Sequence, residues 1–323
     1  MARSDLLLEI IKAGITGDKS LLRKAVSAVA AEERSKQHKV LAERLEALIK
    51  ELSDENTYKN GRSLDNNKVF SLIHEITPEK KFSDLVLPND VSSICSELIE
   101  EHHRSDLLRS YNLEPRNRIL LLGPPGNGKT SLAEAIAEAL MLPLLVVRYE
   151  NVIGSYLGET ADRLRNLVDY ARARRCVLFF DEFETLGKER GDMQETGEIK
   201  RVVSSLLMQI DSLPNYVLVV AATNHPELLD RAVWRRFQVK LELPQPSANG
   251  LIKWFKQYEK HIEISLGYTF DTLSKQLNGY NFAEIEEFGR SIYRQYVLDQ
   301  PNADMKKIVS SVLKQYKARF AKI

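Results

Sequence analysis

The octapeptide Gly-Pro-Pro-Gly-Asn-Gly-Lys-Thr at residues 123–130 constrains the fold more than any other feature of this chain. It fits the phosphate-binding pattern G-x-x-x-x-G-K-[ST]. An apolar run at 118–122 precedes it and a helix-favouring run at 131–140 follows, so the sequence predicts a strand, a glycine loop and a helix. In that context, backbone N–H groups and the positive end of the helix dipole bind phosphate.

The residue types in this loop each have a predicted task. Gly126 and Gly128 allow backbone angles and a close approach that a Cβ atom would block. Lys129 would reach the β- and γ-phosphates of a nucleotide, and the Thr130 hydroxyl would bind Mg²⁺. The predicted nucleotide-binding residues of the loop are Pro125, Gly126, Asn127, Gly128, Lys129, Thr130 and Ser131.

The composition limits the partners of the chain. Its 323 residues suffice for two or three domains, and 43% hydrophobic residues exclude a disordered or fibrous protein. With 46 basic and 45 acidic residues the net charge is +1, so no overall attraction to nucleic acid or to an anionic membrane is expected. Cys95 and Cys176 are predicted to be reduced thiols. Because no signal peptide or bilayer-spanning run is evident, we expect a soluble, cytoplasmic protein without membrane contact.

The pattern of apolar residues divides the chain into four predicted parts. Residues 1–55 predict a small all-α domain, and the polar residues 56–79 predict a linker. Residues 80–245 alternate short apolar strands with helices, which indicates an α/β fold with a parallel sheet covered by helices on both faces. Residues 246–323 predict a smaller helical domain. Strands are expected at 118–122, 144–148, 176–180, 216–221 and 238–242.

Two carboxylates follow the strand predicted at 176–180. Asp181 and Glu182 would lie at the carboxyl edge of the sheet, where doubly wound folds bind ligands. Asp181 suits a contact with Mg²⁺ through water, and Glu182 suits a general base that polarises the attacking water. A solvated acidic loop is the alternative interpretation, and the nearby glycine loop weakens it.

Further polar groups follow the strand predicted at 216–221. The Asn224 amide could hydrogen-bond both the γ-phosphate and the attacking water, although an Asn that merely serves a turn is the alternative. Arg235 and Arg236 lie in a short segment together with Arg231. A guanidinium there could contact the γ-phosphate of a neighbouring subunit, and ordinary surface charge is the alternative.

Several motifs in order, over residues 80 to about 290, resemble the ATPases of the AAA group within the AAA+ superfamily. These motifs are the loop at 123–130 (Walker A), residues 177–182 (Walker B with its catalytic glutamate), Asn224 (sensor 1), Arg235 and Arg236 (the arginine-finger region) and residues 279–285 (the start of the last lid helices). The resemblance implies a P-loop AAA+ module with a C-terminal helical lid. It also implies hydrolysis of ATP with Mg²⁺ in a homo-oligomeric ring, expected to be a hexamer.

The resemblance also bears on residues that spacing alone does not assign. Phe82-Ser83-Asp84-Leu85 looks like the segment that packs against adenine in this family, which implies nucleotide contacts from Asp84 and Leu85. The two finger arginines are adjacent in this chain, whereas two residues separate them in many relatives. The resemblance therefore leaves open whether Arg235 or Arg236 reaches the nucleotide of the neighbour.

Tyr156 and Leu157, followed by a glycine, are similar to the first pore loop of AAA motors, which grips an extended polypeptide. An aromatic ring on a loop can hold any sequence by apolar contact, whereas a tyrosine packed under a surface loop is the alternative.

The expected function is ATP-driven remodelling, unfolding or regulation of a protein substrate or partner. A DNA-directed AAA+ ATPase, such as a loader or transposition helper, and a non-threading nucleotide switch are the alternatives. No helix-turn-helix pattern or basic arm supports nucleic-acid binding.

The N-terminal region suggests one particular partner. The segment 11–34 resembles the N-terminus of small bacterial AAA ATPases that are encoded beside subtilisin-like serine proteases. This implies a protease that another chain supplies, because no credible serine-protease residue set is evident in this sequence.

Overall fold

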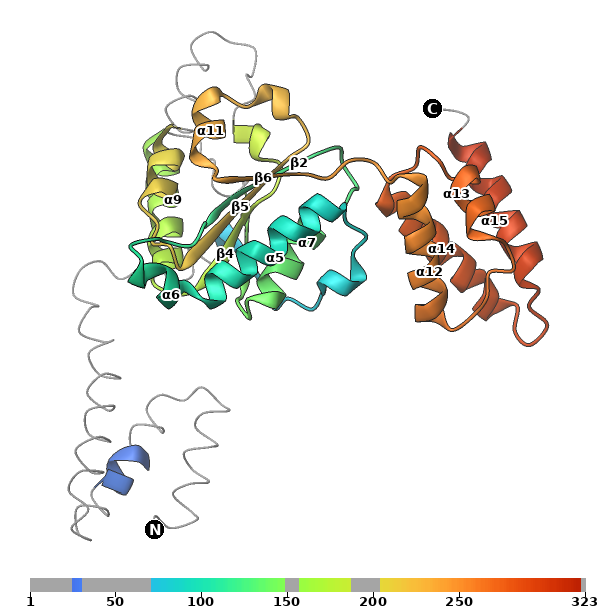
Figure 1. The fold of residues 1–323 in the computed structure, drawn as a ribbon, viewed down its shortest axis with the longest axis horizontal. Helices are drawn as coiled ribbons and strands as arrows, with labels where there is room; N and C mark the ends of the chain where they lie inside the picture. The colour runs from blue at the N-terminus through green and yellow to red at the C-terminus, as the bar shows by residue number, and fades with distance from the viewer. Residues whose placement is uncertain (1–24, 31–70, 149–156, 187–203, 321–323) are drawn as a thin grey trace. The chain divides into compact units, whose positions relative to one another are not determined.

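The computed structural model describes residues 25–30, 71–148, 157–186 and 204–320 of the chain (Figure 1). The chain divides into two compact units, Met1–Asp65 and Asn66–Ile323. In the first unit the described residues 25–30 are helical. The rest of the helical domain predicted at 1–55 lies outside the described residues, so the predicted domain boundaries stay predictions.

The second unit is built on a six-stranded sheet in the order β1-β3-β4-β5-β2-β6. The strands are β1 (Ile73–Ile76), β2 (Arg118–Leu122), β3 (Leu144–Val147), β4 (Cys176–Phe180), β5 (Val217–Thr223) and β6 (Val239–Glu242). The strands from β2 to β6 are parallel to their neighbours, and β1 pairs antiparallel with β3 at one edge. The predicted α/β fold with a mainly parallel sheet is therefore confirmed.

Helices cover both faces of this sheet (Figure 1). Helices of this part include α5 (Asn89–His103), α6 (Ser105–Ser110), α7 (Lys129–Ala139), α9 (Leu157–Arg172) and α11 (Arg231–Arg236). On the face of α5 and α7, β4 contributes Val177 and Phe179 to the core. On the face of α9 and the helical residues 204–211, β4 contributes Leu178 and Phe180. Alternate side chains of one strand thus fill two cores, as expected of a central parallel strand.

Strand β1 was not predicted, and it lies in the segment 56–79 that the sequence assigned to a linker. Its four residues are Ile-His-Glu-Ile, of which Ile73 is buried and Ile76 half-buried. These apolar residues are three positions apart, so the strand lacks the alternation that marks a half-buried strand. Pairing with β3, a contact distant in sequence, forms β1.

Four helices after the sheet form a separate apolar core, and this region is called the lid below. They are α12 (Ala248–Ile262), α13 (Phe270–Gln276), α14 (Phe282–Leu298) and α15 (Met305–Phe320). Phe255, Phe288 and Ile292 lie at the centre of this core. In a capping box at the start of α14, Asn281 and Glu284 each accept a backbone hydrogen bond from the other. The predicted C-terminal helical region is confirmed.

None of the helices in the described part of the chain is both long enough and apolar enough to cross a membrane.

Candidate functional site

Three neighbouring strands end in the predicted site residues. In the sheet order, β4, β5 and β2 follow one another. The glycine loop follows β2, Asp181 follows β4, and Asn224 follows β5 directly. Because parallel strands have their carboxyl ends at the same edge, the fold brings these groups to one place, as the sequence predicted.

The glycine loop has the backbone of a phosphate cradle. Gly126 has φ +77° and Gly128 has φ +84°, both in the left-handed region that favours glycine. Gly128 is also the N-cap of α7, so the loop runs straight into a helix N-terminus. Between them, Asn127 is 3% exposed, and its side-chain Nδ2 and Oδ1 lack a hydrogen-bond partner among the described residues. A buried amide whose Nδ2 donor is unused fits a phosphate ligand, because phosphate oxygens accept hydrogen bonds.

Lys129 is buried at the start of α7, with 6% of its surface exposed. Its Nζ donates to the carbonyl oxygens of Gly123 at 2.7 Å and Pro124 at 3.0 Å, and to Oδ1 of Asn224 at 2.7 Å. Burial lowers the pKa of Lys129, and two nearby carboxylates oppose this shift. The ammonium group therefore joins the loop after β2 to the polar residue after β5.

The two predicted Mg²⁺ contacts touch each other. Thr130 Oγ1 donates a hydrogen bond to Asp181 Oδ2 at 3.0 Å. In the described parts of the chain, no group of three or more His, Cys, Asp or Glu side chains could hold a metal ion. Mg²⁺ in phosphate-transfer sites is bound by one or two protein groups, with water and substrate phosphates completing its octahedron. Thr130 and Asp181 fit that kind of site.

Glu182 has an unusual backbone conformation. Its φ of 48° lies in the left-handed region, which is uncommon for a residue other than glycine. Its backbone N–H donates to Asp181 Oδ1 at 3.0 Å, and its side chain is exposed. Such conformations cost about 1–3 kcal/mol and cluster at functional sites. An exposed carboxylate held beside Asp181 suits the activation of a water molecule.

One buried carboxylate at this edge was not predicted. Glu184 lies in the short helix η3 (Phe183–Leu186), and its Oε1 accepts a hydrogen bond from the backbone N–H of Asn224 at 3.2 Å. The available signal was the second glutamate in the run Asp-Glu-Phe-Glu at 181–184. Sequence reasoning passed over it because acidic residues are mostly exposed.

The segment predicted to pack against adenine includes the short helix η2 (Phe82–Asp84). The carboxylate of Asp84 accepts hydrogen bonds from the backbone N–H of Lys81 at 2.9 Å and from Ser83 Oγ at 3.2 Å. Leu85 is half-buried and packs against the core that contains α7 residues. Contacts of Asp84 and Leu85 with a nucleotide stay a prediction.

The lid contacts both the glycine loop and this segment. The backbone N–H of Ala283, at the start of α14, donates to the carbonyl oxygen of Gly126 at 2.9 Å. Gln257 Nε2, on α12, donates to the carbonyl oxygen of Ser83 at 3.1 Å. A Cβ atom on Gly126 would lie 2.7 Å from the side chain of Asn281. The predicted nucleotide loop is therefore bounded by the lid on one side.

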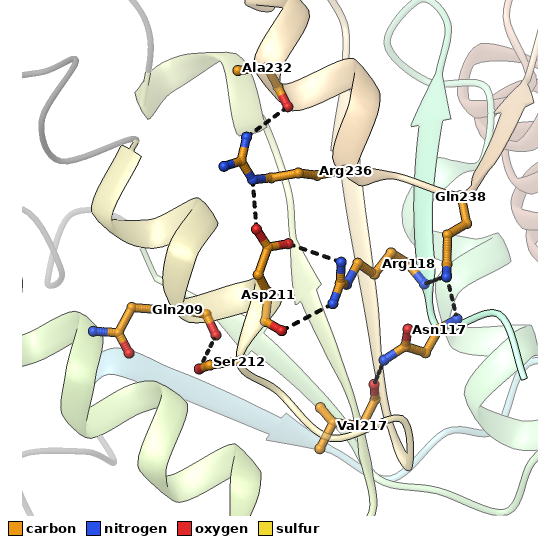
Figure 2. A network of polar contacts seen from close by, with 9 residues as sticks. All are labelled: Asn117, Arg118, Gln209, Asp211, Ser212, Val217, Ala232, Arg236 and Gln238. Atoms are coloured by element: carbon orange, nitrogen blue, oxygen red, sulfur yellow. Dashed lines mark hydrogen bonds and ion pairs between the residues drawn. The ribbon is translucent and has the colours of Figure 1, made fainter. Parts of the chain in front are cut away.

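The two predicted finger arginines have different surroundings, and Figure 2 shows those of Arg236. Arg236 Nε pairs with Asp211 Oδ2 at 2.8 Å, and its Nη1 donates to the carbonyl oxygen of Ala232 at 3.1 Å. The other oxygen of Asp211 pairs with Arg118, the first residue of β2, at 2.9 Å. Arg235 is exposed and has no hydrogen bond or ion pair with the described residues. The structure thus distinguishes the two adjacent arginines by their contacts, which the sequence could not do.

The predicted pore-loop residues lie at the edge of what the structure describes. Tyr156 falls outside the described residues, and Leu157 is the first residue of α9. Contacts of these two residues with a polypeptide therefore stay a prediction.

The fold and the site define a class of protein. A parallel sheet with helices on both faces, a glycine loop between β2 and α7, and an acidic residue after β4 are the features of a P-loop nucleotide-binding protein. The sequence profile of the "ATPase family associated with various cellular activities (AAA)" matches residues 119–245. An uncharacterized AAA family ATPase from Sinorhizobium fredii is 34% identical over 307 residues, which cover 93% of this chain and 91% of that protein. The chain belongs to the AAA family of ATPases.

Two other similar proteins share a shorter region. A cell division cycle protein 48 homolog from Archaeoglobus fulgidus is 33% identical over 186 residues, which cover 56% of this chain but 25% of that protein. A proteasome-activating nucleotidase from Methanoculleus marisnigri is 33% identical over 189 residues, covering 56% of this chain and 46% of that protein. Because these alignments span about a quarter and under half of the relatives, they concern one part of those proteins. Membership of the AAA family supports nucleotide binding and ATPase activity in this chain.

Proposed function

We propose that this protein is a ring-forming AAA ATPase that uses ATP hydrolysis to remodel or unfold a protein substrate. The observation that carries the proposal is the 2.7 Å contact between Lys129 Nζ and Asn224 Oδ1. It joins the glycine loop to the predicted water-aligning group, and Lys129 directly precedes Thr130, whose hydroxyl bonds Asp181. Similarity to a proteasome-activating nucleotidase and to a cell division cycle protein 48 homolog supports a protein substrate.

The proposed reaction converts ATP and water to ADP and phosphate. The backbone amides of residues 125–131 and the Lys129 ammonium hold the phosphates. Glu182 accepts a proton from water, whose oxygen forms a bond to the γ-phosphorus as the bond to the β,γ-bridging oxygen breaks. Asn224 aligns that water. Thr130 would hold Mg²⁺ directly and Asp181 would hold it through water, and the bound ion would neutralise phosphate charge. 

The adenine and the neighbouring subunit have separate proposed contacts. Asp84 and Leu85 would line the adenine side of the site. Arg235 is the proposed arginine finger, because it is exposed and free of bonds to the described residues, whereas Arg236 is paired with Asp211. Arg236 would then fix the end of α11, from which Arg235 projects to the next subunit.

The proposed assembly is a homo-oligomeric ring of six subunits. Tyr156 and Leu157 would line its pore and grip an extended polypeptide. Residues 1–55 would select the substrate or adaptor, and a subtilisin-like protease from another chain is the proposed partner, on the resemblance of segment 11–34. These finer points rest on the family resemblance and on the relatives, not on contacts in the described part of the chain.

Phosphate release by the full chain tests the ATPase. We expect wild type to hydrolyse ATP with Mg²⁺, and Glu182→Gln to bind ATP but to lose at least about a hundredfold in kcat, since its amide cannot take up the proton. Mass photometry should show that Glu182→Gln with ATP stays assembled. A wild-type chain that remains monomeric and releases no phosphate would contradict the proposal.

Mixed rings test the arginine finger. Arg235→Ala and Glu182→Gln should each be inactive alone, with Arg235→Ala losing at least about a hundredfold in kcat. In mixtures, a Glu182→Gln subunit supplies Arg235 to a neighbour whose Glu182 is intact, so part of the activity should return. Mixtures as inactive as the separate variants would contradict a finger that acts between subunits.

The Glu182→Gln trap and a pore variant test the substrate. With ATP, the trap should retain a protein that wild type releases. Tyr156→Ala should lose processing of that protein while its ATPase rate stays within about threefold of wild type. Tyr111→Ala is the matched control, because Tyr111 is an exposed tyrosine at the end of α6. Retention of DNA in place of a protein would contradict the proposed substrate class.

A further inference from the structure

A buried carboxylate beside the proposed catalytic groups has no part in the reaction described above. Glu184 is 3% exposed, and its Oε1 accepts the hydrogen bond from the backbone N–H of Asn224. Its Oε2 is also buried and has no hydrogen-bond partner among the described residues. A buried carboxylate with one unbonded oxygen is unfavourable for folding. A role in the site explains its presence better than stability does.

The bonds of Lys129 determine what holds Asn224 in place. An ammonium group has three N–H donors, and those of Lys129 contact Gly123, Pro124 and Asn224. To bind a phosphate oxygen, Lys129 must therefore release at least one of these acceptors. The Asn224 acceptor is a side-chain oxygen, whereas the other two are backbone carbonyl oxygens of the glycine loop. Asn224 is the acceptor that can be released without moving the loop.

After that release, the backbone must keep Asn224 in position. Thr223 and His225 flank Asn224, and Thr223 Oγ1 accepts a hydrogen bond from the backbone N–H of His225 at 3.1 Å. Glu184 Oε1 accepts a hydrogen bond from the backbone N–H of Asn224 itself. The bond to Glu184 is thus the restraint that acts on the residue whose amide must stay beside the phosphate.

We propose that Glu184 is a positioning residue for the ATPase reaction, which holds the Asn224 amide beside the γ-phosphate and the attacking water when Lys129 turns to the nucleotide. The inference rests on the proposed function of Asn224. Glu184 itself contacts neither ATP nor water in this assignment. Its effect should therefore fall on kcat, and the binding of ATP should change little.

Two small substitutions separate the hydrogen bond from the charge. Glu184→Gln keeps an acceptor at the same reach and removes the charge, whereas Glu184→Asp keeps the charge and withdraws the acceptor by one methylene group. We expect Glu184→Asp to lower kcat about tenfold with KM for ATP within about threefold, and Glu184→Gln to keep at least about a third of kcat. Glu263→Asp, the same change at an exposed residue after α12, is the control. Equal losses in both variants, or a larger loss in Glu184→Gln, would overturn the proposal.

The Asn224→Ala background tests whether Glu184 acts through Asn224. There the positioned amide is absent, so Glu184→Asp should lower kcat by less than about twofold. A further tenfold loss would mean that Glu184 acts on the fold or on another group, and it would overturn the proposal.

Hydrogen exchange at the Asn224 amide gives a readout that does not depend on turnover. Exchange should be faster in Glu184→Asp than in wild type, Glu184→Gln and Glu263→Asp. Unchanged exchange would overturn the positioning role, even in a chain with normal ATPase activity. Faster exchange in a chain whose wild type releases no phosphate would instead contradict the proposed function and leave the Glu184–Asn224 bond established.

Discussion

The two ends of strand β2 carry polar networks that differ in burial. At its carboxyl end, the loop leads to Lys129, whose ammonium is buried and fully bonded. At its amino end, Arg118 pairs with Asp211, whose side chain is 37% exposed and also pairs with Arg236. A buried charge depends strongly on its partners, whereas exposed ion pairs contribute about 0–1 kcal/mol each. The comparison separates a network suited to chemistry from one suited to holding a surface group in place.

The amino end of β2 also connects several elements (Figure 2). Gln238 Oε1 accepts hydrogen bonds from the backbone N–H groups of Asn117 at 2.9 Å and Arg118 at 3.3 Å. The Asn117 side chain donates to the carbonyl oxygen of Val217, at the start of β5, at 3.1 Å. The position of Asp211, and through it Arg236, is therefore fixed to the sheet.

The largest expected effect is at the buried end. Lys129→Ala should weaken ATP binding at least about a hundredfold, because the site loses its only proposed phosphate-binding ammonium in a poorly solvated place. Fluorescent nucleotide titration measures this. Lys240→Ala, at an exposed position on β6, should leave the affinity unchanged. Normal affinity of Lys129→Ala for ATP would mean that the buried network at the carboxyl end of β2 is not a phosphate site.

A smaller effect is expected at the exposed end. Asp211→Ala should lower the ATPase rate of the proposed ring about tenfold, because Arg236 loses the contact that fixes the end of α11. Nucleotide affinity should not change, and the free energy of unfolding should fall by only about 1 kcal/mol.

A similar ion pair elsewhere provides the control for Asp211. Asp169 pairs with Arg172 on α9, and its side chain is 42% exposed. Asp169→Ala should match Asp211→Ala in stability but keep the ATPase rate. If the two variants lose the same activity, the contact of Asp211 with Arg236 has no specific effect on the reaction through α11.

The sequence predicted the carboxyl end of β2 much better than the amino end. Binding phosphate restricts the residue types so strongly that the pattern at 123–130 identifies the loop. Asp211, by contrast, is an ordinary acidic residue 93 positions from Arg118 and 25 from Arg236, and only the fold brings them together. Strand β1 was missed for the same reason, since it forms on a distant partner, and the burial of Glu184 beside Asn224, 40 positions away, also depends on the fold.

A third prediction concerns the contact between the glycine loop and the lid. Gly126 and Gly128 share a positive φ, but only a Cβ atom at Gly126 would meet a neighbour, the side chain of Asn281 at 2.7 Å. Both alanine variants should suffer the backbone strain. Gly126→Ala should in addition displace Asn281 from its cap on α14, at about 1 kcal/mol of further destabilisation.

Thermal unfolding without nucleotide measures this difference. In the Asn281→Ala background the extra cost of Gly126→Ala over Gly128→Ala should disappear, because the cap is already absent. If Gly126→Ala is still less stable than Gly128→Ala in that background, the new Cβ atom clashes with a group other than the Asn281 side chain.

The smallest expected effect is a pH dependence at the amino end of β2. His102, on α5, is buried, and its Nε2 bonds the carbonyl oxygen of Arg116 at 2.8 Å. Burial lowers the pKa of His102 from its ordinary value of 6.5, and the hydrogen bond to Arg116 and the charge of Glu101 only partly oppose this shift. The unfolded chain therefore binds a proton more readily than the folded one. This group contributes stability above pH 6.5 that is lost as the pH falls from there through the lowered pKa.

His102→Gln isolates that contribution, because glutamine can donate the same bond but does not titrate. Between about pH 7.5 and about pH 5.5, the melting temperature of wild type should fall more steeply than that of His102→Gln. His103→Gln is the matched control, since His103 is exposed on the same helix. Parallel curves for wild type and His102→Gln would mean that burial at this end of the strand is too slight to affect titration.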